Sequence, residues 1–150
     1  MVREQRRAAC AGLRACSKYG TVVATAASAH YSGSLIAMAQ SAAHVGFGCV
    51  ALQVVGDSFD DEAHPLVHRL PDPAEPLLPT AEHCVARSGA VKSMKAYMHR
   101  TVQLYKAHMQ LTILEEGLHM LVVDCDWRFM LNPLPFILKL QPAVDLVALH

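Results

Sequence analysis

The feature that most constrains this fold is a long segment without charge: no Asp, Glu, Lys or Arg stands between Tyr19 and Gly56. Serine, histidine and glutamine interrupt it too often for a membrane helix, which needs ~20 predominantly apolar residues. Two short apolar runs, 21–25 and 49–55, instead predict buried strands. Apolar residues recur every three or four positions over 33–45, which predicts a helix that ends near Gly46. Strand, helix and strand in this order predict a βαβ unit with parallel strands.

The rest of the chain predicts a loop, a long helix and a third strand. Prolines and acidic residues crowd 57–80, which predicts a solvated surface loop. An apolar stripe with a period of about 3.6 residues predicts a helix over 90–116. The run 119–124 predicts a third strand, and 136–140 the start of another helix. Because the strand runs are continuously apolar, we expect a parallel sheet with helices on both faces, an α/β fold.

Composition excludes several classes of protein. The 150 residues are about one domain by length, and an apolar fraction of 53% excludes a disordered chain. Thirteen basic residues balance thirteen acidic ones, so we expect no nucleic-acid partner. We separate a basic N-terminal segment, 1–18, from a domain over 19–150. The sequence predicts neither a signal peptide nor a transmembrane segment in this chain.

Cysteine and histidine spacing indicates no metal or disulfide framework. The cysteines are odd in number and form no C-x-x-C pair, which disfavours a zinc knuckle and a disulfide scaffold. The histidines form neither an H-E-x-x-H pair nor a histidine-rich tract. We therefore expect mostly reduced thiols in the core, at Cys10, Cys16, Cys49, Cys84 and Cys125.

The segment that most strongly indicates a functional site directly follows the third predicted strand and has the sequence Asp124-Cys125-Asp126. In open α/β sheets, ligands bind at the carboxyl ends of the strands. On extended backbone, side chains two residues apart point the same way, and two such carboxylates repel unless a cation lies between them. Mg²⁺ and Mn²⁺ take oxygen ligands and add water and substrate phosphates. Asp124 and Asp126 are thus predicted metal ligands, with Cys125 facing the core; the alternative is that Asp124 caps a turn and Asp126 is solvated.

Two classes of enzyme use D-x-D after a buried strand. In haloacid-dehalogenase-like phosphatases the first aspartate, here Asp124, is a nucleophile. Such enzymes carry Thr or Val where Arg128 stands, and most of their domain follows the motif, whereas only 24 residues follow it here. In nucleotide-sugar transferases, D-x-D follows two or three strands of a nucleotide-binding fold. That order matches the predicted elements of this chain.

Residues 106–135 resemble the plant and algal nucleotide-diphospho-sugar transferase family that includes arabinosyl- and xylosyltransferases. Upstream, Thr25 and Tyr31 resemble the family's first strand-to-loop turn, and Asp57 falls where its second strand ends. The sequence departs from the family pattern at Ser28 and Asn132, and its tryptophan stands two residues early. The likeness is carried by a helix lysine, an apolar strand, D-x-D and two prolines: Lys106, Leu114, Gly117, Val122, Val123, Asp124, Asp126, Pro133 and Pro135.

The resemblance implies a partial GT-A, Rossmann-like sheet with flanking helices, truncated at its C-terminus. It implies a Golgi-lumen glycosyltransferase that moves a pentose or hexose from a UDP-sugar to a glycan or glycoprotein acceptor, with Mn²⁺ or Mg²⁺ as cofactor. An inactive nucleotide-binding fragment is the alternative, and no catalytic residue is predicted. We expect Trp127 and Phe129 to pack under the metal loop. The nucleotide-sugar would contact Thr25, Tyr31, Asp57, Lys106 and Asp124.

Overall fold

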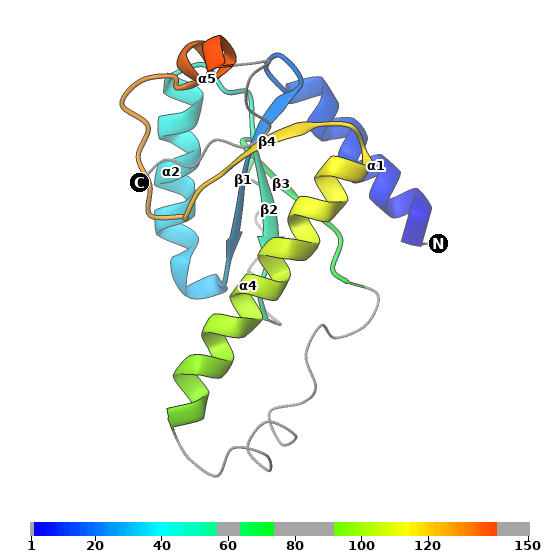
Figure 1. Cartoon of the computed structure of the whole chain (residues 1–150), viewed down its shortest axis with the longest axis vertical. Helices are drawn as coiled ribbons and strands as arrows, with labels where there is room; N and C mark the ends of the chain where they lie inside the picture. Colours follow the sequence, from blue (N-terminus) through cyan, green and yellow to red (C-terminus); the bar gives the residue numbers. More distant parts are fainter. Residues whose placement is uncertain (1, 57–63, 74–91, 141–150) are drawn as a thin grey trace.

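The computed structural model describes residues 2–56, 64–73 and 92–140, which form a parallel sheet with helices on both faces (Figure 1). The strands of this sheet lie in the order β3–β2–β1–β4. They are β1 (Thr21–Ala27), β2 (Val50–Val54), β3 (Val67–Arg69) and β4 (His119–Val122). The described helices are α1 (Val2–Cys16), the 3-10 helix η1 (Ala29–Tyr31), α2 (Ser32–His44), α4 (Lys92–Glu115) and α5 (Leu134–Leu140).

β1 lies inside the sheet and pairs in parallel with β2 on one side and β4 on the other. Val23 stands opposite Val50 in the first ladder and opposite Leu121 in the second. α2 connects β1 to β2, which is the predicted βαβ unit. The α/β class and the parallel sheet are thus confirmed, and the predicted strands and helices begin and end within a few residues of their expected bounds.

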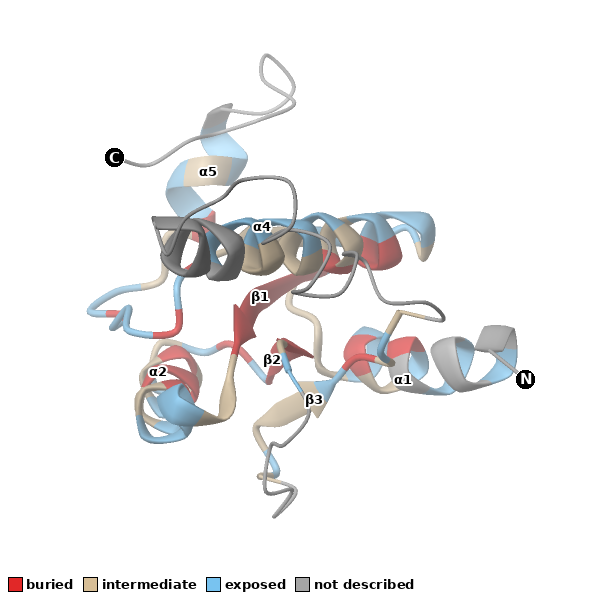
Figure 2. Ribbon diagram, turned by 90° about the horizontal axis from the view of Figure 1, so that it is seen from below, coloured by how far each residue is buried: buried red, intermediate tan, exposed pale blue. Residues whose placement is uncertain are grey.

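Each face of the sheet has its own apolar core (Figure 2). α2 covers one face and contributes Leu35 and Met38. α1 and α4 cover the other face, where Leu13 of α1 joins Met109 and Ile113 of α4. All seven residues of β1 and all five of β2 are buried, which explains why these strands are apolar except at Thr21, Thr25 and Gln53.

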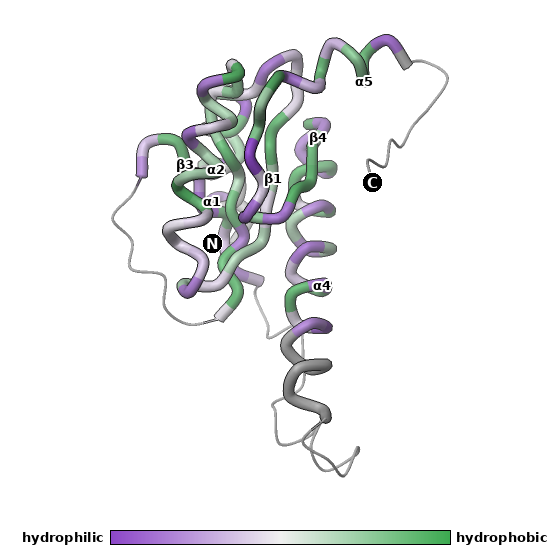
Figure 3. The backbone as a smooth tube through the Cα atoms, turned by 90° about the vertical axis from the view of Figure 1, so that its left-hand side faces the viewer, coloured by the Kyte–Doolittle hydropathy of each residue, from purple (hydrophilic) through white to green (hydrophobic). Residues whose placement is uncertain are grey.

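α4 packs on the sheet through one side, and Figure 3 shows hydrophobic and hydrophilic residues interspersed along the coloured part of this helix. Met109 and Ile113 of the predicted stripe are fully buried, while the side chains of Met94 and Met98 lie outside the described residues. Gly117 follows the helix with φ at 73°, the left-handed conformation that ends helices. No helix in the described part of the chain is both long enough and apolar enough to cross a membrane.

The predicted loop over 57–80 is wrong in one part, because Val67–Arg69 forms β3 and pairs in parallel with β2. Pro65 and Pro71 bound this strand instead of interrupting it, and proline is tolerated on edge strands. Leu70, at its end, is buried in the core beneath α1 and α4. A strand of three residues is too short for a periodicity argument to detect. The remaining parts of the predicted loop lie outside the described residues.

A disulfide joins Cys16, the last residue of α1, to Cys49, which directly precedes β2. The expectation of reduced thiols is therefore wrong for this pair. It is confirmed for Cys10 and Cys125, which are free and buried, while Cys84 lies outside the described residues. Because 33 positions separate the bonded cysteines, only the packing of α1 against the sheet brings them together.

Candidate functional site

The candidate site lies at the carboxyl ends of β1 and β4, where the strand order reverses. From β1 the chain passes outward through β2 to β3, and it then returns to place β4 on the opposite side of β1. Ligands of doubly wound α/β sheets bind in the crevice at such a reversal. The fold therefore brings the D-x-D segment, which follows β4, to the position expected of a ligand site.

An ion pair joins α4 to this edge of the sheet. The Lys106 Nζ donates a hydrogen bond to Oδ1 of Asp124 at 2.5 Å. Lys106 stands one turn before the buried Met109, so its stem lies along the packed side of α4 and its ammonium reaches the strand end. The Lys106 side chain is 19% exposed and that of Asp124 is 63% exposed. The ion pair therefore combines a largely sheltered cation with a carboxylate that faces solvent.

The sequence predicted extended backbone for the two aspartates of D-x-D, and the structure shows that this prediction is wrong. β4 ends at Val122, and residues 124–127 form a turn in which the Trp127 N–H donates to the carbonyl oxygen of Asp124 at 3.0 Å. Asp126 is exposed, and its carboxylate makes no hydrogen bond or ion pair to the residues that the structure describes. One carboxylate is thus engaged by Lys106, and the other is open to solvent.

The residues around the turn divide between core and surface. Cys125 is buried on the α2 side of the sheet, as predicted. Burial raises the pKa of the Cys125 thiol, and the negative charge of Asp126 raises it further. Phe129 is also buried, with its ring centroid 5.5 Å from that of Phe47. The predicted packing is wrong for Trp127, which is 43% exposed, because the turn directs it outward beside Asp126.

The other predicted contact residues lie apart from the ion pair. Thr25 is fully buried in β1, and its hydroxyl has no hydrogen-bond partner among the described residues. Its strand neighbours Val23 and Ala27 pack on the α2 side, so by alternation Thr25 faces away from α4. Tyr31 ends η1 and is exposed. Asp57 lies outside the described residues.

A buried polar pair beside the site was missed by the sequence reasoning. Gln53 of β2 is fully buried, and its Oε1 lies 3.3 Å from Nδ1 of His108 on α4. Its Nε2 has no partner among the described residues. Lys106 and His108 lie on opposite flanks of the buried stripe of α4, so one reaches the end of β4 and the other reaches β2. Gln53 interrupts the otherwise apolar run 49–55, and that interruption was the available signal.

We find no protein family, curated protein or solved structure that matches this chain. The fold and the geometry of the site are therefore the observations that bear on function. They establish a parallel sheet, consistent with a Rossmann-like core, with a lysine–aspartate pair at its strand-order reversal.

Proposed function

We propose that this chain binds a nucleoside-diphosphate sugar at the carboxyl ends of β1 and β4, as the nucleotide-binding part of a glycosyltransferase. The observation that carries the proposal is the Lys106–Asp124 pair at the strand-order reversal. A diphosphate needs positive charge, and Lys106 provides it within a position where α/β sheets bind nucleotides. The resemblance of residues 106–135 to nucleotide-diphospho-sugar transferases supports UDP as the nucleotide and a glycan or glycoprotein as the acceptor.

The D-x-D segment has a donor set that suits Mn²⁺ or Mg²⁺. Such ions are held through one or two carboxylates together with waters and substrate phosphates. Asp126 offers a carboxylate without a partner among the described residues, and Asp124 offers a second, solvent-facing one. Asp124 and Asp126 would hold the cation, which when bound neutralises charge on the departing nucleoside diphosphate. Asp124 would then leave Lys106 free to donate to a diphosphate oxygen.

The binding test uses Trp127, the only tryptophan of the chain and the neighbour of Asp126. We expect UDP to change its fluorescence, and Mn²⁺ to tighten UDP binding at least tenfold, about 1.4 kcal/mol. Asp126→Asn should remove the Mn²⁺ effect. Asp72→Asn is the matched control, because Asp72 is another exposed aspartate and pairs with Arg69 far from the motif in sequence. Equal UDP affinity with and without Mn²⁺ in the unmutated protein would contradict the metal assignment.

A second experiment separates a transferase from a fragment that only binds nucleotide. UDP release is measured from UDP-pentoses and UDP-hexoses, with and without simple glycan acceptors. Release that depends on acceptor and disappears in Asp124→Ala supports sugar transfer. Metal-dependent UDP binding without any release supports the binding fragment. With a phosphate monoester as substrate, transfer of its phosphoryl group to Asp124 with release of the alcohol, followed by hydrolysis to inorganic phosphate, would instead indicate the phosphatase alternative.

A further inference from the structure

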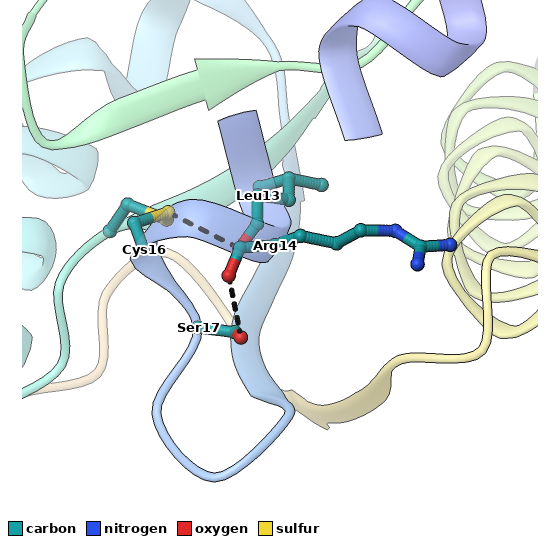
Figure 4. The surroundings of a disulfide bond; sticks show 5 residues. Leu13, Arg14, Cys16 and Ser17 are labelled. Atoms are coloured by element: carbon teal, nitrogen blue, oxygen red, sulfur yellow. Dashed lines mark hydrogen bonds between the residues drawn. A yellow bond between two sulfur atoms is a disulfide. The ribbon is translucent and has the colours of Figure 1, made fainter. Parts of the chain in front are cut away.

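Three side chains with metal-binding atoms meet beneath α1, apart from the D-x-D segment. They are Cys16 at the end of α1, Cys49 directly before β2, and His68 in β3. One ligand atom of each lies within 4.8 Å of the others. Cys49 is buried, and Cys16 and His68 are half-buried. Figure 4 shows Cys16 in the last turn of α1, with its sulfur near the carbonyl oxygen of Leu13.

Two glycines permit this approach. A Cβ on Gly48 would lie 2.5 Å from the carbonyl oxygen of Cys16, so only glycine lets the end of α1 come this close to the start of β2. A Cβ on Gly12 would lie 3.0 Å from the His68 ring, which therefore rests against the backbone of α1. We find no hydrogen bond from the ring nitrogens of His68 to the described residues. The imidazole is thus positioned beside the two sulfurs, and no polar partner among the described residues competes for it.

We propose that Cys16, Cys49 and His68 bind one zinc ion when the disulfide is reduced. Two thiolates and an imidazole are the ligands that zinc prefers, and three protein ligands leave a fourth position for water. Zn–S bonds of about 2.3 Å and Zn–N bonds of about 2.0 Å place ligand atoms roughly 3.5–3.8 Å apart around a tetrahedral ion. The observed clustering is compatible with that spacing once the sulfur–sulfur bond has opened.

The sulfurs of Cys16 and Cys49 can therefore either form the disulfide or bind a metal ion, but they cannot do both at once. A dithiol reductant transfers two electrons and two protons to the disulfide and becomes a disulfide itself. Zinc then displaces the two thiol protons, which pass to solvent. The reducing strength of the surroundings would decide which form is present. This site takes a soft or borderline ion through sulfur and nitrogen, so it is separable from the oxygen ligands of D-x-D.

The experiment uses the full chain with Cys10, Cys84 and Cys125 replaced by alanine, so that the proposed ligands are its only thiols. After reduction and anaerobic removal of the dithiol, Co²⁺ is titrated as a spectroscopic substitute for zinc. We expect one Co²⁺ per chain, a thiolate-to-cobalt absorption band, and displacement of Co²⁺ by Zn²⁺. Oxidation to the disulfide should abolish the band. His68→Gln should weaken binding at least about tenfold, whereas His119→Gln, on the exposed side of β4, should not.

Several outcomes would overturn the proposal. They are absence of the band in the reduced protein, equal Co²⁺ binding by the oxidised protein, and unchanged affinity in His68→Gln. His68→Gln keeps both cysteines, and its cooperative urea unfolding in the reduced state, compared with that of the parent, reports whether the chain is still folded. A loss of metal binding in a variant that still unfolds cooperatively can then be assigned to the missing imidazole and not to misfolding.

Discussion

The two ends of the sheet are held together in different ways. At the carboxyl end, α4 meets the segment after β4 through the Lys106–Asp124 ion pair, whose carboxylate faces solvent. At the amino end, α1 meets β2 through the Cys16–Cys49 disulfide, and Cys49 is buried. An exposed ion pair contributes little stability but can exchange partners, whereas a crosslink contributes much and constrains its surroundings. The comparison suggests that nucleotide binding belongs at the carboxyl end, and that the covalent crosslink of the oxidised protein stabilises the amino end.

Removing the crosslink should produce the largest effect. Cys16→Ser, compared with the oxidised parent, should lower the unfolding free energy by about 3–4 kcal/mol, the loop-entropy expectation for a separation of 33 residues. Asp124→Asn at the other end should change it by less than about 1 kcal/mol, because the ion pair is solvent-screened. Urea denaturation of the three proteins measures both values. Similar losses of unfolding free energy in the two variants would contradict the conclusion that the crosslink stabilises the fold more than the ion pair does.

A methyl group at Gly48 should produce the next largest effect. Gly48→Ala should destabilise the protein by about 1–3 kcal/mol, because the new Cβ would lie 2.5 Å from the carbonyl oxygen of Cys16. Gly33→Ala is the matched control, since Gly33 lies in α2 with no atom within 4 Å of an added Cβ. It should stabilise by up to about 1 kcal/mol through helix propensity. Thermal denaturation under oxidising conditions compares the two, and equal shifts would contradict the close-approach argument.

Neutralising Lys106 should affect ligand binding more than folding. Lys106→Met should weaken UDP binding in the presence of Mn²⁺ about tenfold, the effect of losing one charge-assisted hydrogen bond. Its effect on the unfolding free energy should stay under about 1 kcal/mol. Lys18→Met, at the amino end of β1, is the control. A large loss of stability with unchanged UDP affinity would show that the Lys106–Asp124 pair stabilises the fold and does not bind the nucleotide.

The smallest expected effect is a pH dependence at Cys125. Its thiol pKa is raised in the folded protein by burial and by Asp126, so the unfolded chain loses this proton first as the pH rises. The Cys125 contribution to stability is therefore fully present below the pKa of the unfolded thiol and is lost as the pH rises from there through the raised pKa of the folded thiol. Cys125→Ala should show a shallower loss of stability at alkaline pH. Alkylation of native Cys125 should also require a higher pH than alkylation of the unfolded chain.

The part of the fold that could be predicted is the part that local pattern encodes. The apolar runs of β1 and β2 and the stripe of α4 predict buried strands and a covering helix, because both faces of a parallel sheet must be apolar. Gly117 ends α4 because glycine adopts a positive φ without strain. The D-x-D segment was also recognisable, because two aspartates directly follow an apolar run.

The contacts between distant segments could not be predicted in this way. β3 was missed because three residues between prolines carry no periodic pattern, and it is defined only by pairing with β2. The turn at residues 124–127 was only the alternative prediction, because two aspartates two residues apart are compatible both with extended backbone and with a turn. Gln53 was missed as a site residue because its partner, His108, lies 55 positions away.

The sequence by itself determined that this chain forms a parallel α/β sheet and that two carboxylates follow one of its strands, because burial on both faces requires continuous apolar runs. Only the tertiary structure decided that Lys106 meets Asp124, that Cys16 bonds to Cys49, and that His68 lies beside both sulfurs. Those contacts between distant residues depend on the register of the strands and on the angles at which the helices cross the sheet. Register and crossing follow from the packing of the whole core, which no local stretch of sequence specifies.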